Sequence, residues 1–315
     1  MLKYFKILFL IIFFSNSVFS QTKSDLTLQT TSGVIYGTIQ VPDNKSNMPL
    51  AIIVSDCKTD ISFDQNLQNQ AQKALADSLV KRGIATLQYD NRGFGKSTAA
   101  GRNGTNLTIE NYVADLNAWI NRFAKNPKFT KIVLVGHGQG ALVAMICAKE
   151  NKNVKKIASL EGAGQTRADV LYEQIQMQFQ NQPQIKEVAE KYIEKLAKGE
   201  IIDEFVPQKL YSYFPPNLNR LFISWFKRNP QTEIATLTIP ILIVQGTADA
   251  QIAENNATLL EKSNPNARKI LIENMNHVFR TCSSTHQLSQ YAANCKPDAP
   301  IKTELCSIVA NFILE

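Results

Sequence analysis

The sequence predicts an α/β fold, in which a mostly parallel central sheet carries helices on both faces. Three observations predict it. Short apolar runs of strand length alternate along the chain with longer segments of helical periodicity. Several of these runs are apolar throughout, as expected of strands that are covered on both faces. The stretch 164–237 interrupts the alternation, because it has helical periodicity and no strand signal.

The strands and helices follow one another in the order that such a sheet requires. The predicted strands cover, in chain order, residues 26–41 as a hairpin of two strands, 50–55, 84–89, 131–135, 154–160, 240–244 and 269–272. The predicted helices cover residues 65–82, 108–125, 136–150 and 301–314. Turn residues mark two of the boundaries, since Ser32-Gly33 joins the hairpin strands and Gly83 ends the first helix.

The stretch without strands predicts a helical cap. Residues 164–237 would then be an insertion into a core formed by residues 21–163 and 238–315. This insertion is rich in aromatic side chains, namely Tyr211, Tyr213, Phe214, Phe222, Trp225 and Phe226. Two interpretations stay open for them: packing of the cap onto the sheet, or lining of a pocket.

The first twenty residues read as a signal peptide, 1–20. Lys3 and Lys6 form a basic start, an eight-residue apolar run covers 7–14, and Ser20 precedes the expected cleavage point. Eight apolar residues are too few to span a membrane, so no stable span is expected after cleavage. The mature protein is expected in the periplasm or outside the cell.

Charge and composition exclude several classes of protein. With 44% hydrophobic and 19% charged residues, the chain is globular rather than disordered. The net charge of +7 falls to +5 when Lys3 and Lys6 are removed, and the other basic residues form no run. Nucleic acid is therefore not expected as a partner. Three scattered histidines without paired ligand spacing predict no metal site.

The cysteines suit an exported protein. Cys282, Cys295 and Cys306 lie near one another in the sequence, and an oxidising compartment allows one disulfide among them. Cys282–Cys295 is favoured, because the segment between them is polar. Cys147 lies in an apolar helical pattern and is expected in the core.

The most informative segment is 131–148, with the sequence KIVLVGHGQGALVAMICA. A buried strand that enters a Gly-x-x-x-Gly turn and then a helix has the pattern of a nucleophile elbow. Gly136 and Gly140 supply the small residues that the sharp turn needs. Here the chain resembles the secreted α/β-hydrolases grouped with serine aminopeptidases and EstD-type carboxylesterases. The resemblance implies an α/β-hydrolase fold and a carboxylic ester or related acyl hydrolase.

Three further segments carry the same resemblance. Residues 89–97 resemble the family's loop after the fourth strand, in which Asp90 and Arg92 are expected to brace the loop. Residues 245–249 resemble the turn that carries the catalytic acid, Asp249, and residues 274–278 resemble the turn that carries the histidine, His277. The order elbow, acid, histidine is the order of this fold.

Other residues compete with these assignments. Glu161, after the sixth strand, is an alternative acid for the histidine. His137 belongs to the elbow and is expected to support the turn, whereas His286 reads as an exposed loop residue.

The elbow departs from the family at its central position. Gly138 stands where the resemblance places the nucleophilic serine, and glycine has no group that can form an acyl-enzyme. The loop that completes the oxyanion hole also differs, reading Ser55-Asp56-Cys57-Lys58-Thr59-Asp60 without the family's glycines. The backbone N–H groups of Asp56 and Gln139 are the expected oxyanion donors.

Two functions of different classes follow. The chain is either a hydrolase that works without the usual serine, through water activated by His277 or a thiol such as Cys57, or a pseudo-hydrolase that binds a small acyl or peptide ligand or a protein partner. No cofactor is expected in either case. The substrate and the oligomeric state cannot be read from the sequence.

Overall fold

The computed structural model describes residues 21–43, 45–56, 64–101, 106–286, 290 and 299–315. The signal-peptide prediction for residues 1–20, the thiol of Cys57 and the thiol of Cys295 fall outside these ranges.

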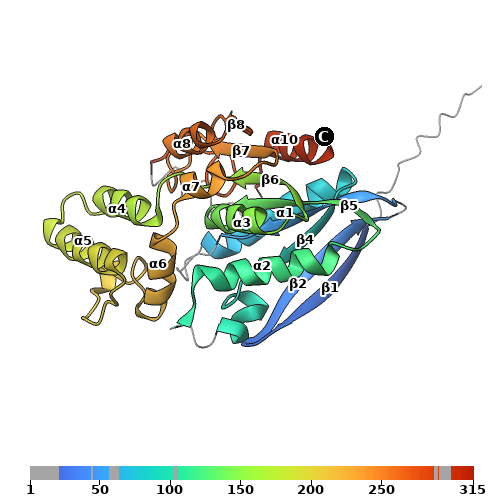
Figure 1. The fold of residues 1–315 in the computed structure, drawn as a ribbon. Coiled ribbons are helices and arrows are strands. Elements are labelled where there is room, and N and C mark those ends of the chain that lie inside the picture. Colours follow the sequence, from blue (N-terminus) through green and yellow to red (C-terminus); the bar gives the residue numbers. More distant parts are fainter. Residues whose placement is uncertain (1–20, 44, 57–63, 102–105, 287–289, 291–298) are drawn as a thin grey trace, which may run out of the picture.

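A twisted sheet forms the centre of the molecule (Figure 1). The eight strands that the described residues form lie in the order β1-β2-β4-β3-β5-β6-β7-β8. Their bounds are β1 (Gln21–Thr30), β2 (Gly33–Pro42), β3 (Met48–Val54), β4 (Ala85–Tyr89), β5 (Phe129–His137), β6 (Val154–Leu160), β7 (Ile241–Gly246) and β8 (Ala267–Ile272). The β1–β2 and β2–β4 pairs are antiparallel and the other pairs are parallel, which confirms the predicted mostly parallel sheet.

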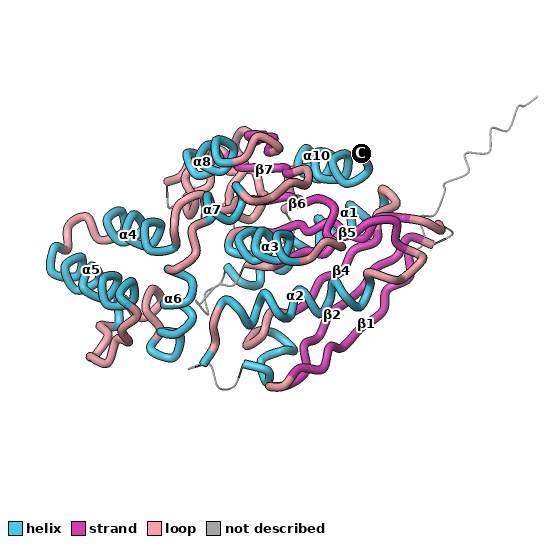
Figure 2. The backbone as a smooth tube through the Cα atoms, in the orientation of Figure 1, coloured by secondary structure: helices cyan, strands magenta, loops and turns pink. Residues whose placement is uncertain are grey.

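Helices cover both faces of this sheet, as Figure 2 also shows. One face is covered by α1 (Asp64–Lys81) and α10 (Thr303–Leu314). The other is covered by α2 (Ile109–Phe123), α3 (Gln139–Glu150) and α8 (Asn255–Ser263). No helix in the described part of the chain is long and apolar enough to cross a membrane.

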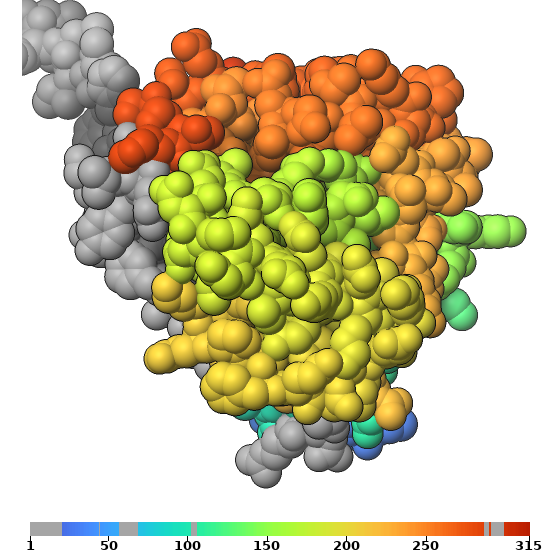
Figure 3. All heavy atoms as spheres, turned by 90° about the vertical axis from the view of Figure 1, so that its left-hand side faces the viewer, coloured from blue at the N-terminus to red at the C-terminus, as the bar shows by residue number. Residues whose placement is uncertain are grey.

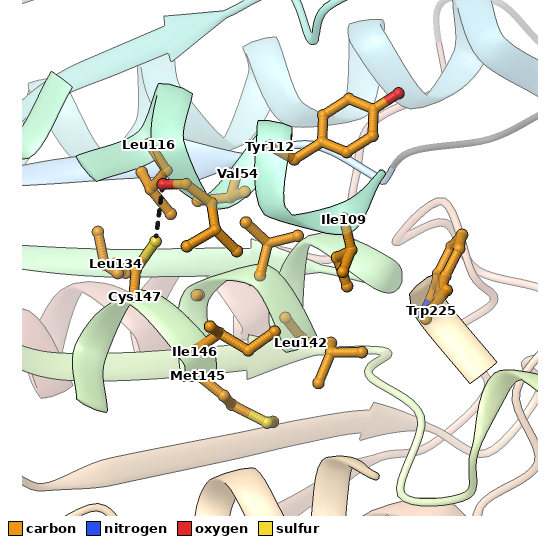
Figure 4. Packing of buried hydrophobic residues seen from close by; sticks show 14 of the residues in the cluster. Val54, Ile109, Tyr112, Leu116, Leu134, Leu142, Met145, Ile146, Cys147 and Trp225 are labelled. Atoms are coloured by element: carbon orange, nitrogen blue, oxygen red, sulfur yellow. Dashed lines mark hydrogen bonds between the residues drawn. The ribbon is translucent and has the colours of Figure 1, made fainter. Parts of the chain in front are cut away.

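The strands bury alternate side chains in two separate cores. In β3, Ile52 packs with α2 and α3 while Ile53 packs with α1 and α10, and both are buried. This double burial explains why the strand is apolar throughout. Figure 4 shows the first core, where Leu134 of β5 meets Leu116 of α2 and Cys147 of α3.

The cysteines differ in part from expectation. Cys147 is a buried free thiol of this core that donates to the carbonyl oxygen of Val113 at 3.4 Å, as its sequence pattern predicted. Cys282 is also a free thiol, which donates to the carbonyl oxygen of Ser284 at 3.2 Å. The favoured Cys282–Cys295 disulfide is therefore not formed here, because a polar turn rather than a second sulfur receives the Cys282 side chain. Cys306 is free and buried.

Four α-helices fill the chain between β6 and β7. They are α4 (Arg167–Gln178), α5 (Pro183–Lys198), α6 (Asn219–Phe226) and α7 (Pro230–Ala235). In Figure 3 the α4 and α5 region, yellow-green to yellow, lies beside the orange C-terminal third of the chain. Phe214, Phe222 and Trp225 are buried in the first core, whereas Tyr211 is 55% exposed. Most of the cap aromatics therefore pack the helices onto the sheet.

A buried ion pair fixes the loop after β4. Arg92 binds Asp115 of α2 through two bonds, Nη2 to Oδ1 at 2.6 Å and Nε to Oδ2 at 3.0 Å. Both side chains are buried, at 7% and 4% exposure. Asp90 accepts the backbone N–H of Lys96 at 2.7 Å, so both residues brace the loop as predicted.

We expect Asp115→Ala to lower the free energy of unfolding by about 3–5 kcal/mol, because it leaves the Arg92 guanidinium buried without its counter-charge. Urea denaturation followed by circular dichroism measures this. Glu187→Ala removes an acid from an exposed pair with Lys191 and is the control, with no measurable loss. Equal effects from the two substitutions would contradict the role given to Arg92.

Candidate active site

The carboxyl ends of four parallel strands bring the predicted motifs together. The elbow follows β5, Asp249 follows β7, His277 follows β8, and Asp56 follows β3. In open α/β sheets this edge is where ligands bind.

Backbone crowding shapes the elbow. A Cβ atom on Gly140 would lie 2.2 Å from the carbonyl oxygen of Val54, and one on Gly136 would lie 2.5 Å from the Cα of Ala141. Only glycine fits at these two positions, as the sequence indicated. Gly138 has φ 54° and ψ −117°, a conformation that L side chains rarely adopt and that nucleophile elbows impose on their central residue.

Asp249 orients His277. Its Oδ2 lies 2.7 Å from Nδ1 of the imidazole, and its Oδ1 accepts the backbone N–H groups of Gln251 and Ile252 at 2.7 and 3.0 Å. Burial raises the pKa of Asp249, but the charge and hydrogen bond of His277 outweigh it and hold that pKa below its usual value. Because an ionised Asp249 only accepts, Nδ1 carries the proton and Nε2 faces the elbow.

Glu161 is a support for Asp249 and does not replace it. Its carboxyl group accepts the N–H of Gly246 at 3.0 Å and the side-chain amide of Gln245 at 2.5 Å. Burial, together with the nearby charge of Asp249, raises the pKa of Glu161 well above its usual value. Of the two buried carboxyl groups, Glu161 therefore holds its proton more tightly, and Asp249 is the one whose oxygen lies beside His277.

His137 supports the loop that carries His277 through a hydrogen bond to its backbone. Its Nε2 lies 2.8 Å from the carbonyl oxygen of His277, which only accepts, so Nε2 carries the proton and Nδ1 accepts from Gln72 at 3.2 Å. Gln72 in turn accepts the hydroxyl of Ser55 at 2.6 Å. This chain links the β3 loop to the backbone of His277, the supporting role expected of His137.

The side chain of Asp56 occupies the centre of the site. Its Oδ1 accepts the backbone N–H of Gln139 at 3.1 Å, and its Oδ2 lies 3.6 Å from Nε2 of His277. A Cβ atom built on Gly138 would lie 2.8 Å from Asp56 Cγ, so the carboxylate fills the space beside the missing nucleophile. The sequence suggested only the backbone of Asp56, and its side chain was missed. The sequence did contain a signal for this role of the side chain. Two positions depart together from the family pattern, since an acid, Asp56, follows β3 and a glycine, Gly138, stands at the elbow.

A cavity of about 540 Å³ opens onto this carboxylate. Asp56, Gly138 and His277 line it from the ends of the sheet strands, and Arg167, Tyr213 and Trp225 line it from the segment between β6 and β7. Tyr213 and Trp225 therefore also line a pocket, which was the second interpretation of the aromatic side chains.

Arg167, at the start of α4, was not singled out by the sequence. Its guanidinium lies 5.5 Å from the ring of Trp225 and 5.8 Å from that of Phe222. Burial lowers its pKa to about 10, and the nearby Asp56 opposes this, so the group is charged at neutral pH. Its Nε is buried and has no hydrogen-bond partner within the described residues.

The remaining candidates lie elsewhere. His286 is exposed, as predicted. In the described ranges no group of three His, Cys, Asp or Glu side chains could hold a metal ion.

Comparisons with known proteins agree with this architecture. A family model described as serine aminopeptidase, S33 matches residues 68–204. Esterase EstD of Thermotoga maritima (strain ATCC 43589 / DSM 3109 / JCM 10099 / NBRC 100826 / MSB8) is 23% identical over 249 residues, 77% of this chain. The match covers only 57% of that relative's length.

Solved structures of esterases share the fold. Est1E from Butyrivibrio proteoclasticus, with bound ferulic acid, gives a TM-score of 0.61 at 19% identity, covering 92% of this chain and 98% of that one. The Pyrococcus furiosus esterase Pf2001 gives 0.58 at 19% identity, covering 93% and 90%. The chain has the α/β-hydrolase fold that its motifs predicted.

We expect Glu161→Gln to flatten the dependence of stability on pH. The raised pKa of Glu161 means that the folded protein holds this proton more tightly, so its stabilising effect is complete below the usual value of 4.5 and is lost as pH rises through the raised value. A glutamine keeps the neutral hydrogen bonds at every pH.

Urea denaturation across the pH range measures the difference. The wild type should lose stability relative to the variant by up to about 1.4 kcal/mol per pH unit between the usual pKa and the raised pKa of Glu161. Glu200→Gln, at an exposed position, is the control and should track the wild type. Parallel curves for wild type and Glu161→Gln would show that Glu161 is ionised in the fold.

Proposed function

We propose that this chain is an exported hydrolase, similar to esterases, in which the His277–Asp249 pair works with the carboxylate of Asp56 in place of a serine. Residues 1–20 would direct its export to the periplasm or the medium, and residues 164–237 would cap the cavity. The observation that carries the proposal is the 3.6 Å approach of Asp56 Oδ2 to Nε2 of His277 beside the empty position at Gly138.

The same geometry is incompatible with the usual acyl-enzyme route. Gly138 has no nucleophilic atom, and the N–H of Gln139 donates to Asp56, although in an acyl hydrolase it would stabilise a substrate oxyanion. Meanwhile the acid, the imidazole and their mutual orientation are intact. An intact base beside a replaced nucleophile supports altered chemistry at a retained site.

A second function has one specific observation in its favour. Because the oxyanion donor is already occupied by Asp56, the cavity also suits a pseudo-hydrolase that binds a small acyl ligand or a partner without turnover. In that case a carboxylic acid such as butyrate would raise the melting temperature equally in the wild type and in His277→Ala.

We expect hydrolysis of para-nitrophenyl butyrate to need two changes in the purified protein, Gly138→Ser and Asp56→Ser together. A serine at 138 needs the space that Asp56 holds, and removal of Asp56 frees the N–H of Gln139. The double variant should exceed the wild type by at least about 10²-fold and show an acyl-enzyme burst. Each single variant should remain near the wild type.

The controls identify the base. Adding His277→Ala to the double variant should remove the gain, whereas adding His286→Ala, at an exposed histidine, should not. A burst in the wild type would refute the proposal. A silent double variant that is folded by circular dichroism would favour the pseudo-hydrolase.

A further inference from the structure

The carboxylate of Asp56 is held as a reacting group would be. Its side chain is 4% exposed, as is that of His277. Gln139 fixes Oδ1 through its N–H, so Oδ2 is the oxygen on the His277 side. An ionised group buried to this extent is costly unless nearby charges and donors compensate it, and here the N–H of Gln139 and the positive charge of Arg167 do so.

We propose that Asp56 Oδ2 is the nucleophile of this site, and that its substrates are small molecules in which a saturated carbon carries an anionic leaving group, such as an alkyl halide, an alkyl sulfate or an epoxide. This inference rests on the proposed hydrolase function and adds the attacking atom and the bond that is cleaved.

The choice of a saturated carbon follows from leaving-group chemistry. If Asp56 attacked an ester carbonyl, the tetrahedral intermediate would expel the weaker base. The carboxylate is the conjugate base of an acid with pKa about 3.9, far weaker than an alkoxide, so the intermediate would return to the starting ester. Attack at a saturated carbon has no such intermediate, because the new bond forms as the old one breaks.

The steps balance with water as the second reactant. Oδ2 bonds to the carbon while the leaving group takes the electron pair of the cleaved bond, which gives an alkyl ester of Asp56. A halide or sulfate departs, whereas the oxygen of an opened epoxide stays on the substrate and takes a proton from solvent. Water then attacks Cγ and gives a proton to Nε2 of His277, whose charge Asp249 stabilises. The oxyanion forms on Oδ1, where Gln139 already donates. Collapse expels the alcohol, which takes the proton from His277. The carboxylic acid left on Asp56 then releases the second proton of the water to solvent, which restores the carboxylate.

These reaction steps give the backbone N–H of Gln139 a role in hydrolysis of the Asp56 ester. In the structure the N–H of Gln139 is bonded to the oxygen that carries the negative charge when the ester is hydrolysed. The donor that is blocked for a substrate carbonyl is therefore correctly placed for the carbonyl of the enzyme's own ester.

Arg167 supplies the opposite charge. It lines the same cavity, and its half-buried side chain places the guanidinium over the rings of Phe222 and Trp225. Its Nη1 donates to Gln174 at 3.5 Å, whereas within the described chain its buried Nε has no hydrogen-bond partner. A cation in the same cavity, close enough for its charge to interact with that of Asp56, would stabilise the departing anion. Asp56 and Arg167 together thus favour a substrate whose saturated carbon is attacked by the carboxylate and whose leaving group becomes an anion near the guanidinium.

The test uses the full protein with two probes, styrene oxide and 2-phenylethyl bromide. His277→Ala should trap the intermediate, because the ester forms and water is not activated. Peptide mass spectrometry should then find the probe's alkyl group on Asp56. The wild type should turn over at least one probe, and in water enriched in oxygen-18 the first turnover should place the heavy isotope in Asp56 and not in the alcohol.

Matched variants separate this from adventitious alkylation. Asp56→Asn should reduce turnover at least about 10³-fold and abolish the adduct. Asp203→Asn, the same change at an exposed acid paired with Lys195, should leave both unchanged. In the His277→Ala background, Arg167→Met should slow formation of the adduct about 10²-fold, and melting temperatures should show that each variant is folded.

The outcomes distinguish the two proposals. Turnover that depends on His277 could still place oxygen-18 directly in the alcohol, or could survive Asp56→Asn. Either result would refute Asp56 as the nucleophile while the proposed hydrolase function would stand. The absence of both turnover and adduct on Asp56 would overturn the nucleophile as well. If the Gly138→Ser/Asp56→Ser protein is also silent, the hydrolase function fails with it.

Discussion

The geometry of this site depends on how closely α3 approaches the end of β3. A carbonyl oxygen of β3 lies where the Cβ of residue 140 would otherwise be, so the first turn of the helix presses against the strand. That contact places the N–H of Gln139 within reach of the loop after β3. In this arrangement the Asp56 carboxyl group occupies the space beside Gly138 that a side chain at position 138 would need.

Once the carboxylate enters the elbow, the electrostatics of the site are reversed. A serine site is neutral at rest and develops negative charge on the substrate, so it is lined with donors. Here a carboxyl group of the protein already lies in the site, beside a backbone N–H and an imidazole, and a half-buried guanidinium lines the same cavity. Such a site suits a ligand that arrives electron-poor, and the relatives' substrates do not transfer simply because the fold is shared.

The sequence predicted the fold better than the chemistry. Continuous apolar runs located β3, β5 and β7 to within about two residues, because strands buried on both faces are apolar throughout and these runs are too short for helices. Motif order located Asp249 and His277. Arg167 escaped notice because it lies on a cap helix, where neither periodicity nor spacing distinguishes a pocket residue from a surface one.

Two other features were hidden for physical reasons. The division of roles between Glu161 and Asp249 depends on which carboxyl group holds a proton, and only burial and neighbouring charges decide that. The Asp56 side chain was hidden because the loop after β3 is usually considered for its backbone donors. Its meaning depends on a glycine 82 positions further along the chain.

The 2.8 Å distance between a Cβ at position 138 and the carboxyl carbon of Asp56 also constrains the history of this protein. A serine and an aspartate cannot occupy the elbow together without displacement of one of them, so a lineage passing between the two arrangements goes through an intermediate that lacks both or crowds both. Each present residue therefore removes the selective advantage of restoring the other. Substitutions at positions 56 and 138 are therefore coupled, because a Cβ at position 138 obliges the Asp56 side chain to move.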